Sequence, residues 1–269
     1  MQGLRPESMA VESSFTFLGT GTSVGVPVIG CPCEVCASKD PCNQRTRSSA
    51  LLRFGDTTLL IDSGPDLREQ ALREGFKSID AILYTHEHVD HVVGFDELRA
   101  FCWRREDPLP LYASQDTLDA LERMFRWAFS SENKYKGYVR PEARVIDGPF
   151  EVGGIAVTPL PVEHGTVTVI GYRFDAPGMK SIAYVPDVKH IPDSTLSLME
   201  GLDVLAIDAL REEEHATHFT TAQALEAIER LKPGRAWLTH LSHENEHSTL
   251  EQSLPPGVLV AHDGLVLDL

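Results

Sequence analysis

The chain is short of basic residues, with 24 Lys+Arg against 40 Asp+Glu and a formal net charge of −16. Nucleic acids and anionic membranes are polyanions, so this balance argues against a protein that binds either one through a general basic surface. It does not exclude a phosphate-processing enzyme, because bound divalent metal ions add positive charge where acidic and histidine ligands cluster.

Long hydrophobic runs are also missing, and no stretch approaches the roughly 20 apolar residues that a membrane span needs. Residues 1–14 are polar and lack the apolar core of a secretory signal, which predicts a flexible leader and a cytoplasmic protein. The length of 269 residues allows one or two domains, and no linker or internal repeat divides the chain. We therefore expect a single domain over 15–269.

Cysteine is scarce and odd in number: there are five, and four of them lie between Cys31 and Cys42. Without an export signal, such clustering favours a metal site over a disulfide framework. Cys31, Cys33 and Cys36 supply three thiols in six residues of a loop from Gly25 to Arg47, which suits a closed structural zinc site. The fourth ligand is either Cys42 or a remote histidine.

The apolar patterns predict alternating strands and helices. Strands are expected at 15–18, 49–54, 57–61, 81–84, 145–146, 155–159, 167–174, 181–185, 204–208 and 235–239, and helices at 66–74, 116–129 and 221–231. This order fits a single α/β sandwich with two sheets inside and helices outside.

A dense group of metal-ligand side chains follows one of the apolar strands, in the segment Thr85-His-Glu-His-Val-Asp-His91. Side chains alternate along an extended chain, so His86 and His88 point the same way. If the chain then turns into a helix, Asp90 and His91 project toward the same point. Three imidazoles and a carboxylate suit Zn, Mn or Fe.

This segment resembles the H-x-H-x-D-H signature of the metallo-β-lactamase fold hydrolases. The resemblance runs from Phe15 to the C-terminus, since later segments of the family pattern occur in order: Leu60-Ile-Asp-Ser-Gly64, Pro161-Val-Glu-His164, Val185-Pro-Asp187 and Leu238-Thr-His240. It implies an α/β fold, the four-layer αββα metallo-β-lactamase sandwich, with a dinuclear metal site along one edge of the sheets.

The resemblance also implies roles for individual residues. One metal would take His86, His88 and His164, the other would take Asp90, His91 and His240, Asp187 would bridge both, and Asp62 would support a ligand histidine from behind. Two metals about 3.5–4 Å apart can hold a bridging hydroxide and clamp an in-line displacement. The implied chemistry is hydrolysis.

Within this fold, Gly19-Thr-Gly21, the cysteine loop and Leu238-Thr-His-Leu-Ser-His243 resemble the cyclic-phosphate phosphodiesterases of the carbon–phosphorus lyase pathway. That family completes its structural zinc with the second histidine of the last segment. The ligands implied here are Cys31, Cys33, Cys36 and His243, which leaves Cys42 as a spare thiol.

A general acid is implied as well, since these phosphodiesterases carry a histidine before the penultimate helix. His218 fits that place, and together with Asp90 it is the catalytic candidate. His215 is the alternative, although its position suits a solvated loop histidine better. Asp208, at the end of a buried strand, is expected to anchor the loop, whereas His190 is expected to be an ordinary surface residue.

The predicted function is a metal-dependent phosphodiesterase that hydrolyses a small cyclic or diester phosphate, with two divalent ions (Zn, Mn or Fe) and one structural Zn. The alternatives are a tRNA 3′-processing-type endonuclease, an oxidative role like that of the pyrroloquinoline-quinone biosynthesis protein, and a non-catalytic zinc-binding scaffold. Against the endonuclease, the sequence has the cysteine loop and no inserted basic arm. The expected partner is a small phosphate ester rather than a nucleic acid or a membrane, and the resemblance implies a homodimer.

Overall fold

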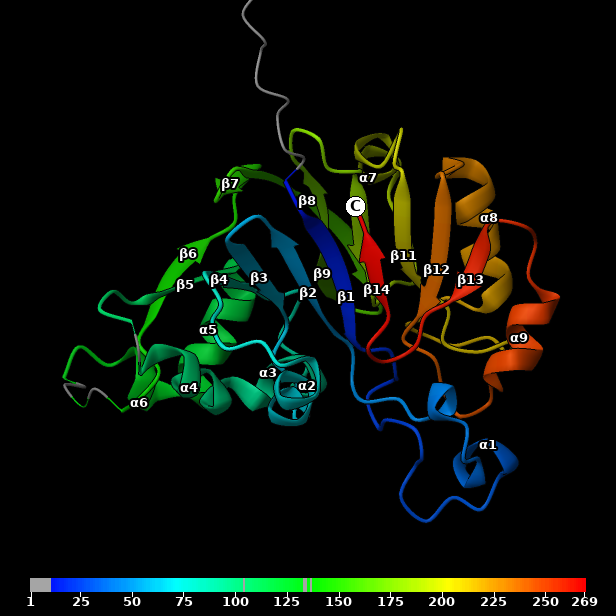
Figure 1. Cartoon of the computed structure of the whole chain (residues 1–269), viewed down its shortest axis with the longest axis horizontal. Coiled ribbons are helices and arrows are strands. Elements are labelled where there is room, and N and C mark those ends of the chain that lie inside the picture. The colour runs from blue at the N-terminus through cyan, green and yellow to red at the C-terminus, as the bar shows by residue number, and fades with distance from the viewer. Residues whose placement is uncertain (1–10, 104, 133–134, 136) are drawn as a thin grey trace, which may run out of the picture.

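The computed structural model describes residues 11–103, 105–132, 135 and 137–269 (Figure 1). Within these residues two seven-stranded sheets face each other. The first has the order β14-β1-β2-β3-β4-β5-β6, and the second has the order β13-β12-β11-β10-β9-β8-β7. The predicted four-layer α/β sandwich is confirmed.

The first sheet is built mainly from the N-terminal half of the chain. Its strands are β1 (Ser13–Gly19), β2 (Ser49–Phe54), β3 (Thr57–Ile61), β4 (Ala81–Leu83), β5 (Leu109–Ala113), β6 (Pro141–Val145) and β14 (Val266–Asp268). The helices of this half are α1 (Glu34–Ala37), η1 (Pro41–Asn43), α2 (Leu67–Glu74), α3 (Val89–Val92), η2 (Val93–Leu98), α4 (Arg99–Cys102), α5 (Gln115–Met124) and α6 (Arg126–Phe129).

The second sheet comes from the C-terminal half. Its strands are β7 (Phe150–Val152), β8 (Ile155–His164), β9 (Val167–Asp175), β10 (Ile182–Val185), β11 (Val204–Asp208), β12 (Arg235–Thr239) and β13 (Val258–Val260). Its helices are α7 (Asp193–Leu198), α8 (Thr221–Leu231) and α9 (His247–Ser253).

Three apolar clusters hold the layers together. The cluster between the sheets contains large aromatic side chains, among them Phe15, Tyr172 and Tyr184. A second cluster packs α2 and α5 on the first sheet, and a third packs α7, α8 and α9 on the second. Since strand side chains alternate, each sheet buries one face in the middle and the other under its helices.

Parallel pairing places the functional loops at one edge. β3, β4 and β5 are parallel to one another, and so are β10, β11, β12 and β13, so the segments that follow them leave from the same end. In Figure 1, α2 and α3 lie below the sheets, and the loop that carries α1 projects from the same side.

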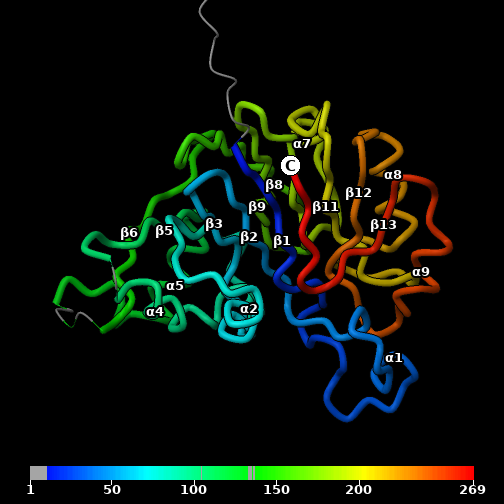
Figure 2. The backbone as a smooth tube through the Cα atoms, in the orientation of Figure 1, coloured from blue at the N-terminus to red at the C-terminus, as the bar shows by residue number. Residues whose placement is uncertain are grey.

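The two ends of the described chain are joined within the first sheet. β1 pairs antiparallel with β14, with Phe15 opposite Leu267. Figure 2 shows the blue and red segments running side by side at the middle of the molecule. The last strand therefore closes the domain onto its first strand.

Several local expectations differ from the structure. The helix expected over 116–129 is broken at Phe125, which separates α5 from α6. The strand expected at 145–146 is β6, which ends at Val145, and the loop from Gly25 to Arg47 contains α1 and η1. The predicted leader ends later than the structure allows, since β1 begins at Ser13; residues 1–10 of that leader lie outside the described residues.

Short elements account for the omissions. β5, β7, β13, β14, α7 and α9 were not predicted, and none is longer than seven residues. Segments of this length show too few periods for hydrophobic patterning to identify. In the part of the chain that the structure describes, no helix is long and apolar enough to cross a membrane.

A substitution at Gly94 tests the close packing between the segments that follow α3 and β3. A Cβ at Gly94 would stand 2.0 Å from the carbonyl oxygen of Gly64, and one at Gly64 would stand 2.2 Å from that of Asp90. We expect Gly94→Ala to destabilise the protein by about 1–3 kcal/mol, the usual cost of overpacking. Thermal unfolding measures the effect. Gly148→Ala is the matched control, because nothing lies within 4 Å of its added methyl group. Equal melting temperatures for the two variants would contradict the packing argument.

Candidate metal centre

Two overlapping groups of ligand side chains meet at the edge where the parallel strands end. His86, His88, His164 and Asp187 offer ligand atoms that all lie within 4.8 Å of one another, and so do His91, Asp187 and His240. Asp187 belongs to both groups. The structure thus brings six of the seven predicted dinuclear ligands into two groups that share one carboxylate.

The local chain conformation explains the arrangement after β4. His88 is extended, with ψ 144°, and is the N-cap of α3, so the chain turns into a helix where the sequence predicted. Asp90 and His91 are in that helix. Asp90 is outside the two groups above, but its Oδ2 lies 3.3 Å from Nε2 of His91, at the border of the second group.

Hydrogen bonds from behind orient three of the imidazoles. Nδ1 of His91 donates to Asp62 at 2.7 Å, Nδ1 of His86 contacts Thr85 Oγ1 at 3.0 Å, and Nδ1 of His164 donates to the carbonyl of Thr217 at 2.7 Å. Each bond leaves Nε2 as the ring nitrogen available to a metal, as in histidine metal sites generally. Asp62 is where the resemblance placed it.

The donor atoms fit a metal ion. Nε2 of His86, Nε2 of His91 and Oδ1 of Asp187 are buried and have no hydrogen-bond partner among the described residues. The Nε2 atoms of His86, His91 and His164 stand 3.4–3.8 Å from the Asp187 carboxylate. Ligand atoms bound at 2.0–2.1 Å to a tetrahedral ion stand about 3.3 Å apart, so this spacing suits a shared cation.

The protonation states also suit metal binding. Burial lowers the pKa of His86 and of His164, and it lowers the pKa of His240 to about 3, so these rings are neutral at pH 7. Burial alone would raise the pKa of Asp187, but His240 and His91 outweigh it and hold that pKa well below the ordinary value. His91 differs: burial would lower its pKa, but Asp187, Asp90 and Asp62 outweigh burial and hold that pKa well above the ordinary value. The three neutral imidazoles are already in the form that binds a divalent ion, whereas His91 would have to release a proton first.

His218 lies against the metal-binding rings. Its ring stacks on His240 at 4.7 Å and meets His164 edge-on at 4.4 Å, and its Nδ1 donates to Asp208 at 2.8 Å. Burial would lower the pKa of His218, but Asp208 outweighs it and raises that pKa. Burial raises the pKa of Asp208 to about 7. The expectation that Asp208 anchors this loop is confirmed by the hydrogen bond.

The sequence did not predict three residues that contact the ligand histidines. Ser48, directly before β2, contacts Nδ1 of His240 at 3.0 Å, while Thr85 and the Thr217 carbonyl contact other ligand histidines. Serine and threonine are common in any sequence, and the Thr217 contact is made by a backbone carbonyl, which every residue has. Only Thr85, next to the histidine motif, carried a positional signal.

A third group of ligand side chains, the cysteine group, joins the cysteine loop to His243. Nδ1 of His243 stands 3.3, 3.4 and 3.6 Å from the sulfur atoms of Cys31, Cys33 and Cys36. Tetrahedral zinc with Zn–S of about 2.3 Å and Zn–N of about 2.0–2.1 Å places such atoms about 3.5 Å apart, so the four side chains fit a closed site. The Cys36 amide, followed by His243, lowers the pKa of Cys33 to about 6, which favours the thiolate.

Cys42 is separate from this group. Its backbone N–H donates to Asp40 at 2.9 Å, and burial raises the pKa of its thiol. Of the two fourth ligands that the sequence left open, His243 is the one that joins the three thiols. His247 contacts Arg45, its ring lies 6.0 Å from that of His262, and neither histidine belongs to any of the three ligand groups.

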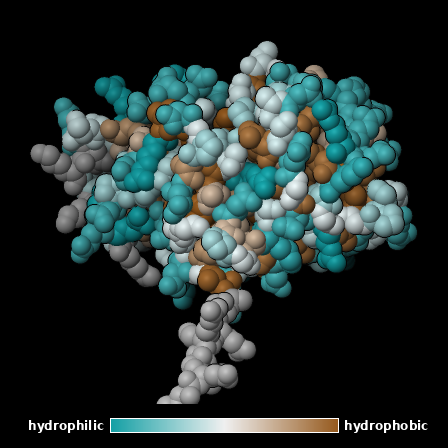
Figure 3. All heavy atoms as spheres, turned by 90° about the horizontal axis from the view of Figure 1, so that it is seen from above, coloured by the Kyte–Doolittle hydropathy of each residue, from teal (hydrophilic) through white to brown (hydrophobic). Residues whose placement is uncertain are grey.

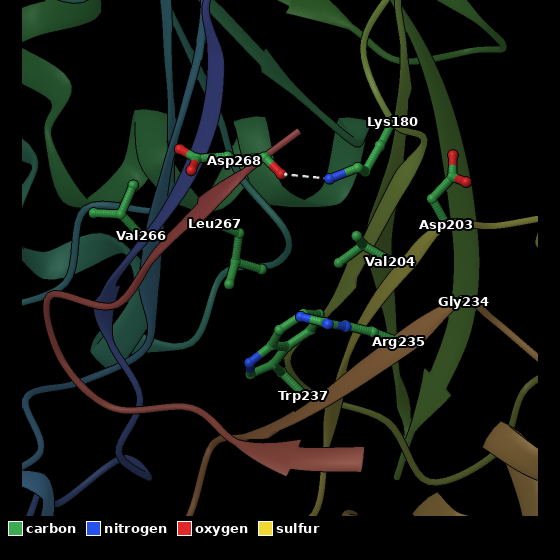
Figure 4. Close-up of a pocket in the computed structure, with 9 residues that line it drawn as sticks. All are labelled: Lys180, Asp203, Val204, Gly234, Arg235, Trp237, Val266, Leu267 and Asp268. Carbon is green, nitrogen blue, oxygen red and sulfur yellow. Dashed lines mark hydrogen bonds between the residues drawn. The ribbon is translucent and has the colours of Figure 1, made fainter. Parts of the chain in front are cut away.

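A hollow of about 600 Å³ lies at the opposite end of the parallel strands (Figure 4). Arg235, at the start of β12, lines it, and Lys180 donates across it to the carbonyl of Asp268 at 3.1 Å. Figure 3 looks onto this end, where hydrophilic residues surround scattered hydrophobic ones. Since no histidine or cysteine lines the hollow, it is unrelated to the metal-binding groups.

The fold and the shared ligand groups define a metallo-β-lactamase fold hydrolase. The beta-lactamase superfamily domain matches residues 57–241, and the chain belongs to this superfamily. The matched stretch contains every residue of the dinuclear group, whereas the three cysteines lie before it and His243 after it.

Solved structures place the chain more closely. A diphosphatase from the PhnP family is 40% identical with a TM-score of 0.89, covering 96% of this chain and 97% of that one. Zinc-bound PqqB from Methylobacterium extorquens (24%, TM-score 0.78) covers 95% of this chain and 100% of that one. The short form of human tRNase Z (18%, TM-score 0.69) covers 94% and 98%. The last two share the fold.

One curated relative is a longer protein. An octanoyltransferase of Porphyromonas gingivalis (strain ATCC BAA-308 / W83) is 39% identical over 261 residues, which are 92% of this chain and 50% of that protein. The chain therefore spans half the length of this relative.

Substitutions at Cys33 and Cys42 should have different effects, because only Cys33 belongs to the cysteine group. Cys33→Ser replaces a soft thiolate by a poor neutral ligand, so we expect the variant to lose one metal ion per chain and to melt at a lower temperature. Cys42→Ser should keep the metal content and the melting temperature of the parent. Elemental analysis and thermal unfolding measure both effects. Equal damage from the two substitutions would contradict a site completed by His243.

Proposed function

We propose that the protein is a metal-dependent hydrolase that cleaves a phosphodiester or diphosphate bond in a small molecule. The observation that carries the proposal is the pair of ligand groups sharing Asp187, with the His218–Asp208 pair stacked against them. The similarity to a diphosphatase that is 40% identical over nearly the whole chain supports a phosphate substrate.

The proposed ligand sets are those that the sequence implied. His86, His88 and His164 would hold one ion, Asp90, His91 and His240 would hold the other, and Asp187 would serve both; Zn, Mn and Fe all suit these donors. Two bound divalent ions supply Lewis-acid activation of water and neutralise charge on the phosphoryl oxygens. With a zinc ion in the cysteine group, about three metals per chain are expected.

The chain's own residues would divide the remaining work. Asp62 holds the ring of His91 in one orientation, and the Thr217 carbonyl does the same for His164. His218 protonates the departing oxygen from Nε2, because its Nδ1 is committed to Asp208. The Asp208 carboxylate keeps that imidazole in the correct tautomer and stabilises its charged form.

A second candidate is the hydrolysis of an acyl ester or thioester. It is favoured by the 39% identity to half of a protein named octanoyltransferase. The ligand groups suit this reaction as well, since the same ions polarise a carbonyl oxygen. An endonuclease acting on tRNA and an oxidative role are less favoured, because the structures named for them share only the fold with this chain. A cytoplasmic homodimer is part of the proposal.

A hydrolysis screen tests the proposal. Purified protein loaded with Zn, Mn or Fe is assayed against cyclic phosphates, linear phosphodiesters, diphosphates, lactones and octanoyl thioesters. We expect turnover of a phosphate substrate and its loss in Asp187→Ala, which removes the carboxylate common to both ligand groups. Turnover of the thioester alone would overturn the phosphate proposal in favour of the second candidate.

His218 gives a more detailed prediction. General acid catalysis is typically worth about 10²–10⁴-fold, so His218→Ala should slow hydrolysis of an alkyl diester within that range while metal content stays the same. The loss should shrink for a nitrophenyl diester, because nitrophenolate departs without a proton. Steady-state kinetics on the two substrates measure the difference. An identical loss on both would rule out the general-acid role.

A further inference from the structure

The ring of His215 contacts the ring of His218, the proposed general acid, on the side nearer to solvent. Its ring centroid is 5.2 Å from that of His218, which in turn contacts the rings of His164 and His240. His215 is partly exposed, whereas His218 is buried. The two histidines therefore form a row that runs from the metal-binding groups toward solvent.

The hydrogen bonds give the two rings different properties. The backbone N–H of Thr217 donates to Nδ1 of His215 at 3.3 Å, and a backbone amide can only donate. Nδ1 of His215 is therefore an acceptor, and the ring proton is on Nε2. In His218, Nδ1 donates to Asp208, so its Nε2 is free to give or take a proton. His218 can transfer protons, whereas His215 offers a fixed N–H donor.

The segment around His215 is held firmly in place. The carbonyl of Thr217 accepts the bond from His164, and a Cβ at Gly165 would stand 2.7 Å from the Thr217 side chain. Lys189 pairs with Glu214 and also donates to the His218 carbonyl at 3.3 Å. The backbone on both sides of His215 is thus held in place, and the Thr217 N–H orients its ring, so the donor is positioned before any ligand arrives.

The nearby cations are already paired. Arg211 pairs with Glu244 at 3.0 Å, and Lys189 pairs with Glu214. Burial, followed by the charges of His218, Arg211 and Lys189, lowers the pKa of His215, so its ring is neutral at pH 7. Nε2–H of His215 has no acceptor among the described residues and remains available to a ligand.

We propose that His215 is a substrate-binding residue whose Nε2–H donates to an anionic oxygen of the leaving group, so that the site selects a substrate with a second phosphate beyond the one attacked. This inference rests on the proposed function and narrows it to diphosphate bonds. Hydrolysis of a dialkyl diphosphate consumes one water, breaks the bridging P–O bond and releases two monoalkyl phosphates. The leaving monoalkyl phosphate carries the charge that a fixed donor stabilises.

Kinetics on a matched pair of substrates test the inference. One substrate is a dialkyl diphosphate, and the other is methyl 4-nitrophenyl phosphate, whose leaving group has no phosphate. We expect His215→Ala to lower kcat/KM on the diphosphate about tenfold, in keeping with a hydrogen bond to a charged group, mainly through KM. The change on the nitrophenyl ester should stay within about twofold. His190→Ala, which removes an exposed histidine, should match the parent on both.

Conservative variants locate the donor atom. In His215→Gln the side-chain amide nitrogen occupies the place of Nε2, and in His215→Asn it occupies the place of Nδ1. We expect Gln, and not Asn, to restore most of the kcat/KM on the diphosphate. A structural role for the ring would not distinguish the two amides. Equal behaviour of Gln and Asn, or an equal loss on both substrates, would overturn the inference.

A binding measurement separates this inference from the proposed function. The metal-loaded protein is titrated calorimetrically with a dialkyl methylenediphosphonate, which cannot be hydrolysed at the bridge, and with a monoalkyl methylphosphonate. We expect the parent to bind the diphosphonate with a lower Kd than the monophosphonate. In His215→Ala the ratio of the two Kd values should shrink by about tenfold. If the parent hydrolyses no phosphate but shows this pattern, the inference stands and the proposed hydrolysis fails. If the parent binds the two ligands equally, the inference fails.

Discussion

A buried carboxylate is the constraint on which the site depends. Asp187 follows β10 and is only 2% exposed, at the centre of two groups of imidazoles. An isolated buried carboxylate costs several kcal/mol, and here His240 and His91 offset part of that cost, since they hold the pKa of Asp187 well below its ordinary value. Divalent cations bound between the rings would stabilise the carboxylate further. The chain therefore buries a negative charge where divalent ions would be held, and the surrounding strands bring the ligand side chains to it.

Two residues of the site have an unusual backbone conformation. Asp62 and His240 adopt φ of 61° and 58°, left-handed values that only a few per cent of non-glycine residues take. Both follow strands directly, β3 and β12, and both turn a side chain back into the edge of the sandwich. Such conformations cost about 1–3 kcal/mol each and persist only where the surroundings fix them. The close backbone contacts of Gly64 and Gly94 are part of that fixation.

How much of this could be read from the sequence depends on distance along the chain. The ligands after β4 lie within six residues, and extended-then-helical geometry predicts their convergence locally. His164, Asp187 and His240 lie far apart, so their place came from the ordered resemblance to a known fold. Ser48 and the Thr217 carbonyl were not predicted, because their role depends on where three separate loops meet. The hydrophobic side chain of Phe125 fits the pattern of one continuous helix, but the backbone at Phe125 leaves the helical conformation and ends α5.

Backbone hydrogen bonds join the chain that leads into the cysteine loop to the segment that carries His240. His243 joins the three thiols and lies three residues beyond His240, and Leu241 between them donates to the Thr20 carbonyl at 2.9 Å. Thr22 returns a bond to Leu241 at 3.2 Å, so the turn that leads into the loop is paired with the strand end that carries His240. A metal ion in the cysteine group would therefore lock the segment that bears a ligand of the other group. The contribution of such an ion to the neighbouring ligand groups would be conformational, because it would hold in place the segment that carries the left-handed His240.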